Sequence, residues 1–430
     1  MARTIVQNFY QTAMTGFSYY AQQEMQISPE RDYRVVRASD EPRFLTVLLQ
    51  INPKHLRKLT KSAMQEEMAM AMGLPEDQFL RIGRGPKGTI SLEIPKPETL
   101  CITITARQLP RRPGVVGIDS KRKPTAINFD NPTTAHALVA GVTGSGKTNT
   151  QKLLAWSQAI HNDPGRLQII MIDVEKRGRQ WSDFAGLAHL AHPIIVEEGE
   201  ARAAIAWVLA EYDRRRRQNV TSPKLFVFID EVKDLVDAGG FTEPLERLAR
   251  LGREYGIHLV LATQHPTIDA LGSSTLRRNL VVRLVSRVDD ATAAHVATGQ
   301  KGTGAEMLTG PGDSFLVQPG QLTRLTVALL KSEDVANLDR VEEPRRLPLD
   351  LDVERVLDVV PAPHPAQTAE THTMEQLAFA LASGAGVNKL QRQFGIGGGR
   401  ASRLRSDADE LRDELFELGK VICDVEDCEE

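Results

Sequence analysis

The segment GVTGSGKT, Gly141 to Thr148, constrains this chain more than any other. It fits the pattern GxxxxGK[ST] without a mismatch, directly follows the apolar run HALVA and directly precedes the run TNTQKLLAWSQAI. Backbone N–H groups of such a glycine-rich turn, backed by a helix N-terminus, hold phosphate oxygens that bulky side chains would exclude. The motif therefore predicts a nucleotide site on a strand, loop and helix unit.

The motif also assigns roles to single residues. We expect Lys147 to reach the β- and γ-phosphates and the Thr148 hydroxyl to bind Mg²⁺. ATP and Mg²⁺ are thus the predicted cofactors. The predicted nucleotide-binding residues are Gly141, Thr143, Gly144, Ser145, Gly146, Lys147, Thr148 and Asn149.

A second apolar run, LFVFID, leads into the paired acids Asp230 and Glu231. We expect Asp230 to hold the Mg²⁺ together with Thr148, and Glu231 to orient and deprotonate the attacking water, because in-line hydrolysis needs a positioned base. An Asp in this place also fits a helix N-cap when it is considered alone. Coupled to the glycine-rich loop, the pair favours nucleotide hydrolysis.

Short apolar runs alternate with helical segments between about His136 and Leu330. Such runs predict a parallel sheet that helices cover on both faces, and hence an α/β fold. The expected strands are HALVAGV, LQIIMIDV, PIIV, LFVFIDEV, HLVLATQ, LVVRLVS and DSFLVQ. The strand and helix patterns between residues 43 and 97 predict a small α+β domain before this sheet.

The composition is that of an ordinary globular protein, with 41% hydrophobic and 25% charged residues. No apolar run approaches the roughly 18 to 20 residues that span a bilayer, and the first residues do not resemble a secretory signal, so we expect a cytoplasmic protein without a membrane partner. The three cysteines are too few and too scattered for a disulfide framework or a four-ligand zinc site.

The net charge of −3 conceals a segregated distribution. Residues 388–405 contain five basic and no acidic residues, whereas residues 406–430 contain eleven acidic and two basic ones. The overall charge therefore does not exclude a nucleic-acid partner, because the sum over the chain says little about any one surface.

Three segments resemble the FtsK/SpoIIIE motors in the order in which that family has them. The stretch GREYGIHLVLATQHPTIDAL, Gly252 to Leu271, resembles the family's GRxxGIHLxLATQRP segment. IIMIDVEKR, Ile169 to Arg177, resembles the strand that ends in Asp, and GAGVNKLQRQFGIGGGRASRL, residues 384–404, resembles the γ winged helix. The resemblance implies a RecA-like P-loop domain with a parallel sheet, preceded by the small α+β domain and followed by a winged helix-turn-helix.

The resemblance implies further roles. Gln264 would sense the γ-phosphate, and Arg253 would act as an arginine finger on the nucleotide of a neighbouring subunit; a surface salt bridge is the alternative for Arg253. Arg277, Arg278 and Arg287 would contact DNA phosphates in a central channel, although such arginines also occur on ordinary solvated surfaces. His265 stands where the family usually has Arg.

The C-terminal run VNKLQRQFGIGGGRASRLRSD fits a helix-turn-helix. Helices are expected near Thr373 to Ala382, Val387 to Phe394 and Gly399 to Leu418. Arg400 and Arg403 would share one face of the last helix for entry into the DNA major groove. A helical cap or an oligomer contact is the alternative for this module.

These observations predict the following organisation: an N-terminal helical lead at 1–40, a small α+β domain at 41–110, a P-loop ATPase domain at 111–340, a Pro-rich linker at 341–371, a winged helix-turn-helix at 372–422 and an acidic tail at 423–430. The implied function is an ATP-dependent translocase that moves along double-stranded DNA as a homo-hexameric ring. Chromosome segregation and DNA transfer are both compatible with it. The alternatives are a secretion-type ATPase that moves a protein, and an ATP-dependent DNA-binding switch without translocation.

Overall fold

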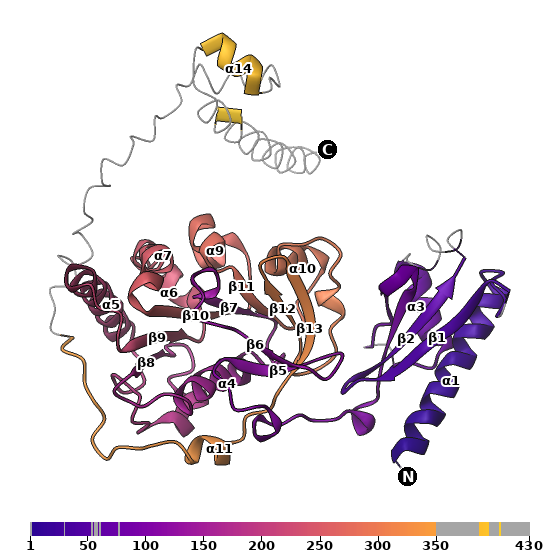
Figure 1. Ribbon diagram of the computed structural model, residues 1–430, viewed down its shortest axis with the longest axis horizontal. Coiled ribbons are helices and arrows are strands. Elements are labelled where there is room, and N and C mark those ends of the chain that lie inside the picture. Colours follow the sequence, from indigo (N-terminus) through magenta and orange to yellow (C-terminus); the bar gives the residue numbers. More distant parts are fainter. Residues whose placement is uncertain are drawn as a thin grey trace, which may run out of the picture. The chain divides into compact units, whose positions relative to one another are not determined.

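The computed structural model describes residues 2–29, 31–52, 55, 59, 62–75, 78–349, 387–394, 404 and 405. The chain divides into two compact units, Met1–Asp358 and Val359–Glu430. The described part of the second unit comprises helix α14, Val387–Phe394, together with residues 404 and 405 (Figure 1). The helix expected from Val387 to Phe394 is thereby confirmed. The two other C-terminal helices, with Arg400 and Arg403, lie outside the described residues.

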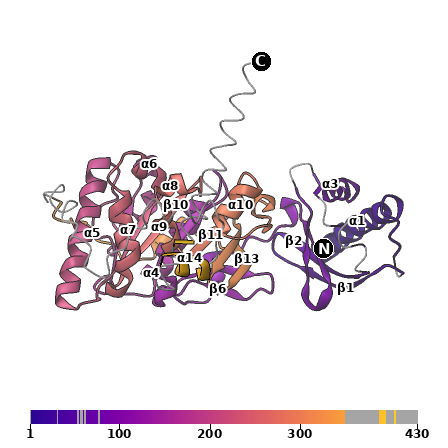
Figure 2. The same ribbon diagram turned by 90° about the horizontal axis from the view of Figure 1, so that it is seen from above.

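A four-stranded antiparallel sheet of order β1-β2-β4-β3 forms the small N-terminal domain. Its strands are β1 (Tyr33–Asp40), β2 (Phe44–Ile51), β3 (Arg81–Arg84) and β4 (Ile90–Pro95), and its helices are α1 (Ala2–Gln23) and α3 (Ser62–Ala71). Phe17 and Met68 of the helices share one core with Val47 and Leu92 of the strands. The helices therefore cover one face of this sheet (Figure 2). Strand β1 belongs to the sheet through its pairing with β2.

The large sheet contains the P-loop and has the order β6-β5-β13-β12-β11-β7-β10-β9-β8. Strands β11, β7, β10, β9 and β8 are parallel, which confirms the predicted α/β core. Their bounds are β7 (Ala137–Ala140), β8 (Leu167–Ile172), β9 (Lys224–Ile229), β10 (Ile257–Thr263) and β11 (Val282–Val285).

Two hydrophobic cores lie on opposite faces of this sheet. Val139 and Val260 contribute to the core beneath helix α4, whereas Leu138 and Leu259, one residue earlier, contribute to the core beneath α5 and α7. Successive strand residues point to opposite faces, so burial on both sides requires the continuous apolar runs seen in the sequence. The helices are α4 (Lys147–Ala159), α5 (Glu198–Gln218), α6 (Val232–Asp237), α7 (Thr242–Leu251), α8 (Ile268–Leu271), α9 (Ser274–Asn279), α10 (Ala291–Thr298) and α11 (Ser332–Ala336).

The remaining strands of the large sheet depart from the predicted pattern. β12 (Asp313–Gln318), β13 (Gln321–Val327), β5 (Val115–Asp119) and β6 (Pro124–Ala126) extend the sheet by antiparallel pairing. The run PIIV was expected to be a strand, and that expectation was wrong. Its Ile195 makes only an isolated bridge with Ile172, because the chain leaves the sheet edge at once to begin α5.

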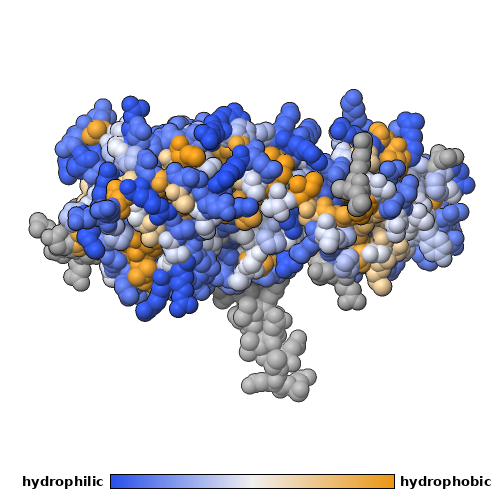
Figure 3. All heavy atoms as spheres, turned by 90° about the horizontal axis from the view of Figure 1, so that it is seen from below, coloured by the Kyte–Doolittle hydropathy of each residue, from blue (hydrophilic) through white to orange (hydrophobic). Residues whose placement is uncertain are grey.

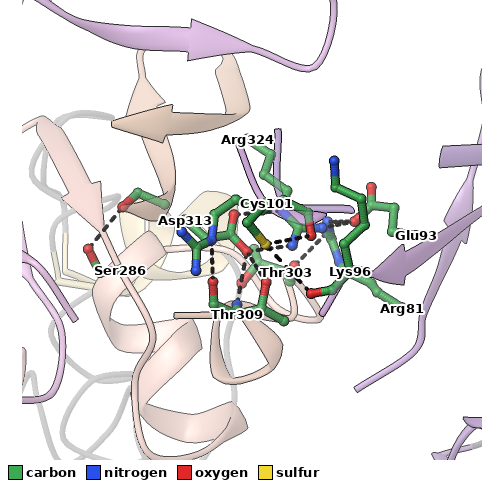
Figure 4. A network of polar contacts seen from close by, with 11 residues as sticks. Arg81, Glu93, Lys96, Cys101, Ser286, Thr303, Thr309, Asp313 and Arg324 are labelled. Atoms are coloured by element: carbon green, nitrogen blue, oxygen red, sulfur yellow. Dashed lines mark hydrogen bonds and ion pairs between the residues drawn. The ribbon is translucent and has the colours of Figure 1, made fainter. Parts of the chain in front are cut away.

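A buried ionic network joins the small domain to the large sheet (Figure 4). The guanidinium of Arg324 donates to both carboxylate oxygens of Asp313, at 2.6 and 2.9 Å, and to Glu93 of β4. Arg81 of β3 donates to the same Glu93 at 3.0 Å and to the Thr303 carbonyl at 2.6 Å. The ring of Phe44 packs 4.0 Å from the Arg324 guanidinium. These contacts fix the small domain against β12 and β13.

Replacing Arg324 by alanine is expected to lower the free energy of unfolding by about 3 to 5 kcal/mol, because Asp313 and Glu93 would lose the cation that compensates their burial. Urea denaturation followed by circular dichroism measures this change. The control is Arg34→Ala, an exposed arginine of β1. Equal stabilities of the two variants would contradict the structural role of the network.

One face of the first unit is mostly polar. On the face shown in Figure 3, hydrophilic side chains dominate and hydrophobic ones form small separate patches. Among the helices that the structure describes, none combines the length and the apolar character that crossing a bilayer requires.

Candidate nucleotide-binding site

The loop Gly141–Thr148 connects β7 to α4 at the edge where the parallel strands end. Gly146 has φ +99°, and a Cβ atom there would lie 3.3 Å from the backbone nitrogen of Gly312, so this position requires glycine. The Gln151 amide in α4 donates to the carbonyls of Ile229 and Val260, at 2.8 and 3.3 Å. These bonds hold the N-terminus of α4 above β9 and β10.

A cavity of about 430 Å³ lies over this loop. Its lining includes six of the eight predicted nucleotide-binding residues, namely Thr143, Gly144, Gly146, Lys147, Thr148 and Asn149. Ser145 is buried instead, and its hydroxyl has no hydrogen-bond partner among the described residues. Gly141 does not line the cavity either, although its carbonyl binds the Lys147 side chain.

The Lys147 ammonium donates to the carbonyls of Gly141, at 2.7 Å, and Val142, at 3.2 Å. Burial lowers the pKa of this lysine, and the charge of Glu231 opposes that effect. Phosphate oxygens would be stronger acceptors than the two carbonyls and would give the ammonium a negatively charged partner. Lys147 is therefore placed to bind a triphosphate within the loop.

Thr148 and Asp230, the two residues expected to hold Mg²⁺, lie close together. The Thr148 hydroxyl lies 3.3 Å from Asp230 Oδ1, at the end of β9. The second oxygen of Asp230 accepts a hydrogen bond of 2.6 Å from Lys176. Mg²⁺ prefers oxygen ligands and usually keeps waters and phosphates in its shell, so one hydroxyl and one carboxylate fit what a nucleotide-bound Mg²⁺ needs from a protein.

Glu231 lies next to Gln264, which follows β10. The Gln264 backbone N–H donates to Glu231 at 2.9 and 3.2 Å, and the Gln264 side-chain oxygen accepts from the Thr143 hydroxyl. Burial raises the pKa of Glu231, whereas hydrogen bonds from Thr263 and Gln264 and the charge of Lys147 lower it. A carboxylate so placed accepts a proton from water more readily than an exposed one.

Arg253 lies at the opposite edge of the sheet. It belongs to η7, Gly252–Tyr255, immediately before β10, whereas Gln264 immediately follows β10. Seven strand residues separate the two edges by about 20 Å. The Arg253 side chain is exposed, and it donates only to the Pro132 carbonyl, at 3.5 Å, among the described residues. Within one chain it does not reach the nucleotide cavity.

Sequence reasoning missed three polar residues of this cavity, Lys152, Lys176 and Gln180. Lys176 forms the ion pair with Asp230, and Gln180 accepts from the Thr148 hydroxyl. Burial opposes the charge on Lys176, but its hydrogen bond to Asp230 raises its pKa. One sequence signal could have found Lys176, which lies three residues after Asp173, at the end of an expected strand. Neighbouring parallel strands end at the same edge of a sheet, so Lys176 could be expected near Asp230.

The arginines predicted to contact DNA differ in their surroundings. Arg277 is half-buried, and its guanidinium donates to the Val296 carbonyl at 2.6 Å. Arg278 is exposed and donates to Ser274 at 3.2 Å. Arg287 is exposed at the end of β11. The neighbouring Arg283 donates to the Val296 and Ala297 carbonyls at the end of α10. Arg278 and Arg287 are thus the better exposed pair.

A larger cavity of about 870 Å³ adjoins the same loop from the side of the small domain. It shares only Thr143 and Gln264 with the phosphate cavity, and Met70, Leu74 and Phe79 form part of its apolar wall. An apolar wall does not suit phosphates, so the smaller cavity is the phosphate site.

The glycine-rich loop lies between the parallel strand β7 and helix α4. The paired acids follow β9, and a polar residue, Gln264, follows β10. Together these features define a P-loop ATPase core of the RecA type. Comparison with known proteins gives a more specific likeness. The sequence model of the FtsK/SpoIIIE family matches residues 105–220, the stretch that contains the glycine-rich loop.

Curated relatives agree with this match. The chain is 30% identical over 305 residues to a DNA translocase FtsK of Oceanobacillus iheyensis, covering 63% of this chain and 38% of that protein. It is 28% identical over 358 residues to the DNA translocase SftA of Bacillus subtilis, covering 74% and 36%. The chain therefore spans less than half the length of these relatives.

Among solved structures, the fold is similar to that of the pCW3 conjugation coupling protein TcpA in its monomer form with ATPγS. The TM-score is 0.50 at 17% sequence identity, covering 74% of this chain and 95% of that one. At this identity the likeness supports the fold alone.

Proposed function

We propose that this protein hydrolyses ATP to move along double-stranded DNA. The observation that carries the proposal is that Lys147 lines the phosphate cavity while Asp230 and Glu231 hydrogen-bond to residues of its lining, Thr148 and Gln264. A lysine for the phosphates, oxygen ligands for Mg²⁺ and a base for water are the parts that in-line hydrolysis of a nucleotide requires. The two curated relatives named as DNA translocases support duplex DNA as the substrate.

The proposed assembly is a homo-hexameric ring. Arg253 lies about 20 Å from the nucleotide cavity of its own chain, so an arginine finger there must act on the nucleotide of a neighbour. The proposed organisation also includes the C-terminal winged helix at 372–422, in which Arg400 and Arg403 would load or orient the motor on DNA.

The ATPase rate with and without long linear duplex DNA tests the proposal. We expect strong stimulation by duplex in the wild type and none in Glu231→Gln. An active enzyme that duplex DNA does not stimulate would contradict the proposal, and would favour either a secretion-type ATPase or a DNA-binding switch.

The proposed DNA contacts are Arg277, Arg278 and Arg287. Replacing Arg278 and Arg287 together by alanine should weaken duplex binding and reduce the slope of log K against log salt concentration by about 1 to 2, because each lost phosphate contact releases about one counterion fewer. Fluorescence anisotropy over a salt series measures this slope.

The matched control for this pair is the double variant Arg34→Ala/Arg217→Ala, which removes two exposed arginines elsewhere. It should keep the wild-type slope. Equal slopes for both double variants would assign Arg278 and Arg287 to ordinary surface.

A further inference from the structure

Helix α1 of the small domain carries no charged side chain over residues 4–23, although 25% of the whole chain is charged. One side of the helix is buried, where Phe17 and Ala21 contribute to the core of the small domain. The other side is exposed to solvent, and the solvent face of a surface helix normally carries its charged residues. Burial within this domain therefore does not explain the absence of charge on the exposed side.

The exposed side of α1 has a regular seam, whose residues follow one another at alternating intervals of three and four. This is the spacing of a coiled-coil contact. The seam consists of the exposed residues Ile5, Asn8, Thr12, Thr15, Tyr19 and Gln22. Its two large apolar or aromatic members are strongly exposed, Ile5 at 48% and Tyr19 at 66%. Depletion of charge together with an exposed tyrosine is typical of a protein–protein interface.

The lack of charge limits what can cover this seam. A nucleic acid or an anionic lipid surface binds through lysines and arginines, which the seam does not have. A protein partner with charged residues at its centre would bury them without a counterpart, which is costly. The partner surface must therefore be uncharged over the length of the helix, and the same seam on a second copy of this chain has that property.

The spacing of the seam also matches itself when a second copy lies antiparallel. Ile5 and Tyr19 each lie seven residues from Thr12, which is about 10 Å along the helix axis. In an antiparallel pair centred on Thr12, Ile5 of each copy meets Tyr19 of the other, and the two Thr12 side chains meet at the two-fold axis. The small Thr12 and Thr15 at the centre let the two helices approach closely.

We propose that α1 forms an antiparallel contact with α1 of a second copy of this chain. The inference goes beyond the proposed function and does not depend on it. A helix of 22 residues is about 33 Å long and offers a contact about 10 Å wide, so the pair buries less than the roughly 1,200 Å² of a stable interface. Association through α1 is therefore weak and depends on concentration. Because the contact is two-fold, it pairs two chains or two rings and does not by itself close a ring.

Opposite charges at Thr12 test the contact. Thr12→Glu and Thr12→Lys each place two like charges at the two-fold axis, so each should weaken self-association about tenfold or more. An equal mixture of the two variants should regain at least the association of the wild type, because Glu then faces Lys. Sedimentation velocity over a concentration series measures this: the wild type and the mixture should form a species of twice the mass that each variant alone forms at the same concentration.

The control position is Gln7, an exposed residue of α1 outside the seam. Gln7→Glu and Gln7→Lys should associate as the wild type does. All four variants should melt at the wild-type temperature by circular dichroism, since both positions are exposed. A wild type without concentration-dependent association, undiminished association of the Thr12 variants, or a mixture that regains none would each overturn the proposal.

A second measurement determines the direction of the pairing. Ile5→Cys and Tyr19→Cys are prepared separately in a background in which Cys101, Cys423 and Cys428 are replaced by serine. When mixed and oxidised, they should form a disulfide-linked dimer on a non-reducing gel, whereas each variant alone should remain unlinked. Dimers of either variant alone would indicate parallel pairing and contradict the antiparallel arrangement. The absence of a cross-link in the mixture would refute the contact.

Discussion

Replacing Glu231 by glutamine is expected to reduce the ATPase turnover number by about 10²- to 10⁴-fold, the usual contribution of a general base. Glutamine keeps the shape of the side chain and one oxygen that can accept from the Gln264 N–H, but it cannot take a proton from water. Nucleotide binding should remain near the wild-type value, because Lys147 and the glycine-rich loop are intact. Steady-state hydrolysis and the binding of a fluorescent ATP analogue measure the two effects separately.

The control for this variant is Glu243→Gln, an exposed glutamate in the first turn of α7. It removes the same charge away from the cavity and should hydrolyse ATP at the wild-type rate. Turnover close to wild type in Glu231→Gln would remove Glu231 from the reaction and leave Gln264 or a phosphate oxygen to activate the water.

Arg253→Ala should reduce the ATPase turnover number by about 10³- to 10⁵-fold and leave nucleotide binding intact, as expected for an arginine finger supplied by a neighbour. The position of Arg253 before β10, on the sheet edge opposite to the P-loop, permits such an action only between chains. Arg250→Ala, which removes an exposed arginine at the end of α7, is the matched control.

Mixing two inactive variants separates action between chains from action within one chain. In a mixed ring, some interfaces place the nucleotide site of an Arg253→Ala chain against the arginine finger of a Glu231→Gln chain. Such an interface has both an intact Glu231 and an intact Arg253. The mixture should then recover ATPase activity that neither variant shows alone. An inactive mixture of chains shown to co-assemble, or an active Arg253→Ala protein, would disprove the assignment.

Local sequence predicted the strand, turn and helix that carry the glycine-rich motif. The loop, its lysine and its threonine are contiguous, so the strand, turn and helix that position them are decided within residues 137–159. The same holds for Asp230 and Glu231, because an apolar strand buried on both faces delivers the residues that follow it to one edge of the sheet.

Other contacts were beyond local reasoning. The ion pair between Lys176 and Asp230 joins residues 54 positions apart, and the hydrogen bond between Thr143 and Gln264 joins residues 121 positions apart. Arg277 was predicted to face DNA, yet its guanidinium binds the Val296 carbonyl. A basic segment looks the same in the sequence whether its arginines face solvent or donate to backbone carbonyls.

The amino-acid sequence alone indicated the glycine-rich loop, the paired acids, the α/β core and the resemblance to the FtsK/SpoIIIE motors, because each depends on neighbouring residues or on a regular apolar pattern. Only the tertiary structure decided that β12, β13, β5 and β6 pair antiparallel and that Arg324 ties the small domain to the sheet. These arrangements depend on packing between segments distant in the chain, for which the sequence carries no periodic signal.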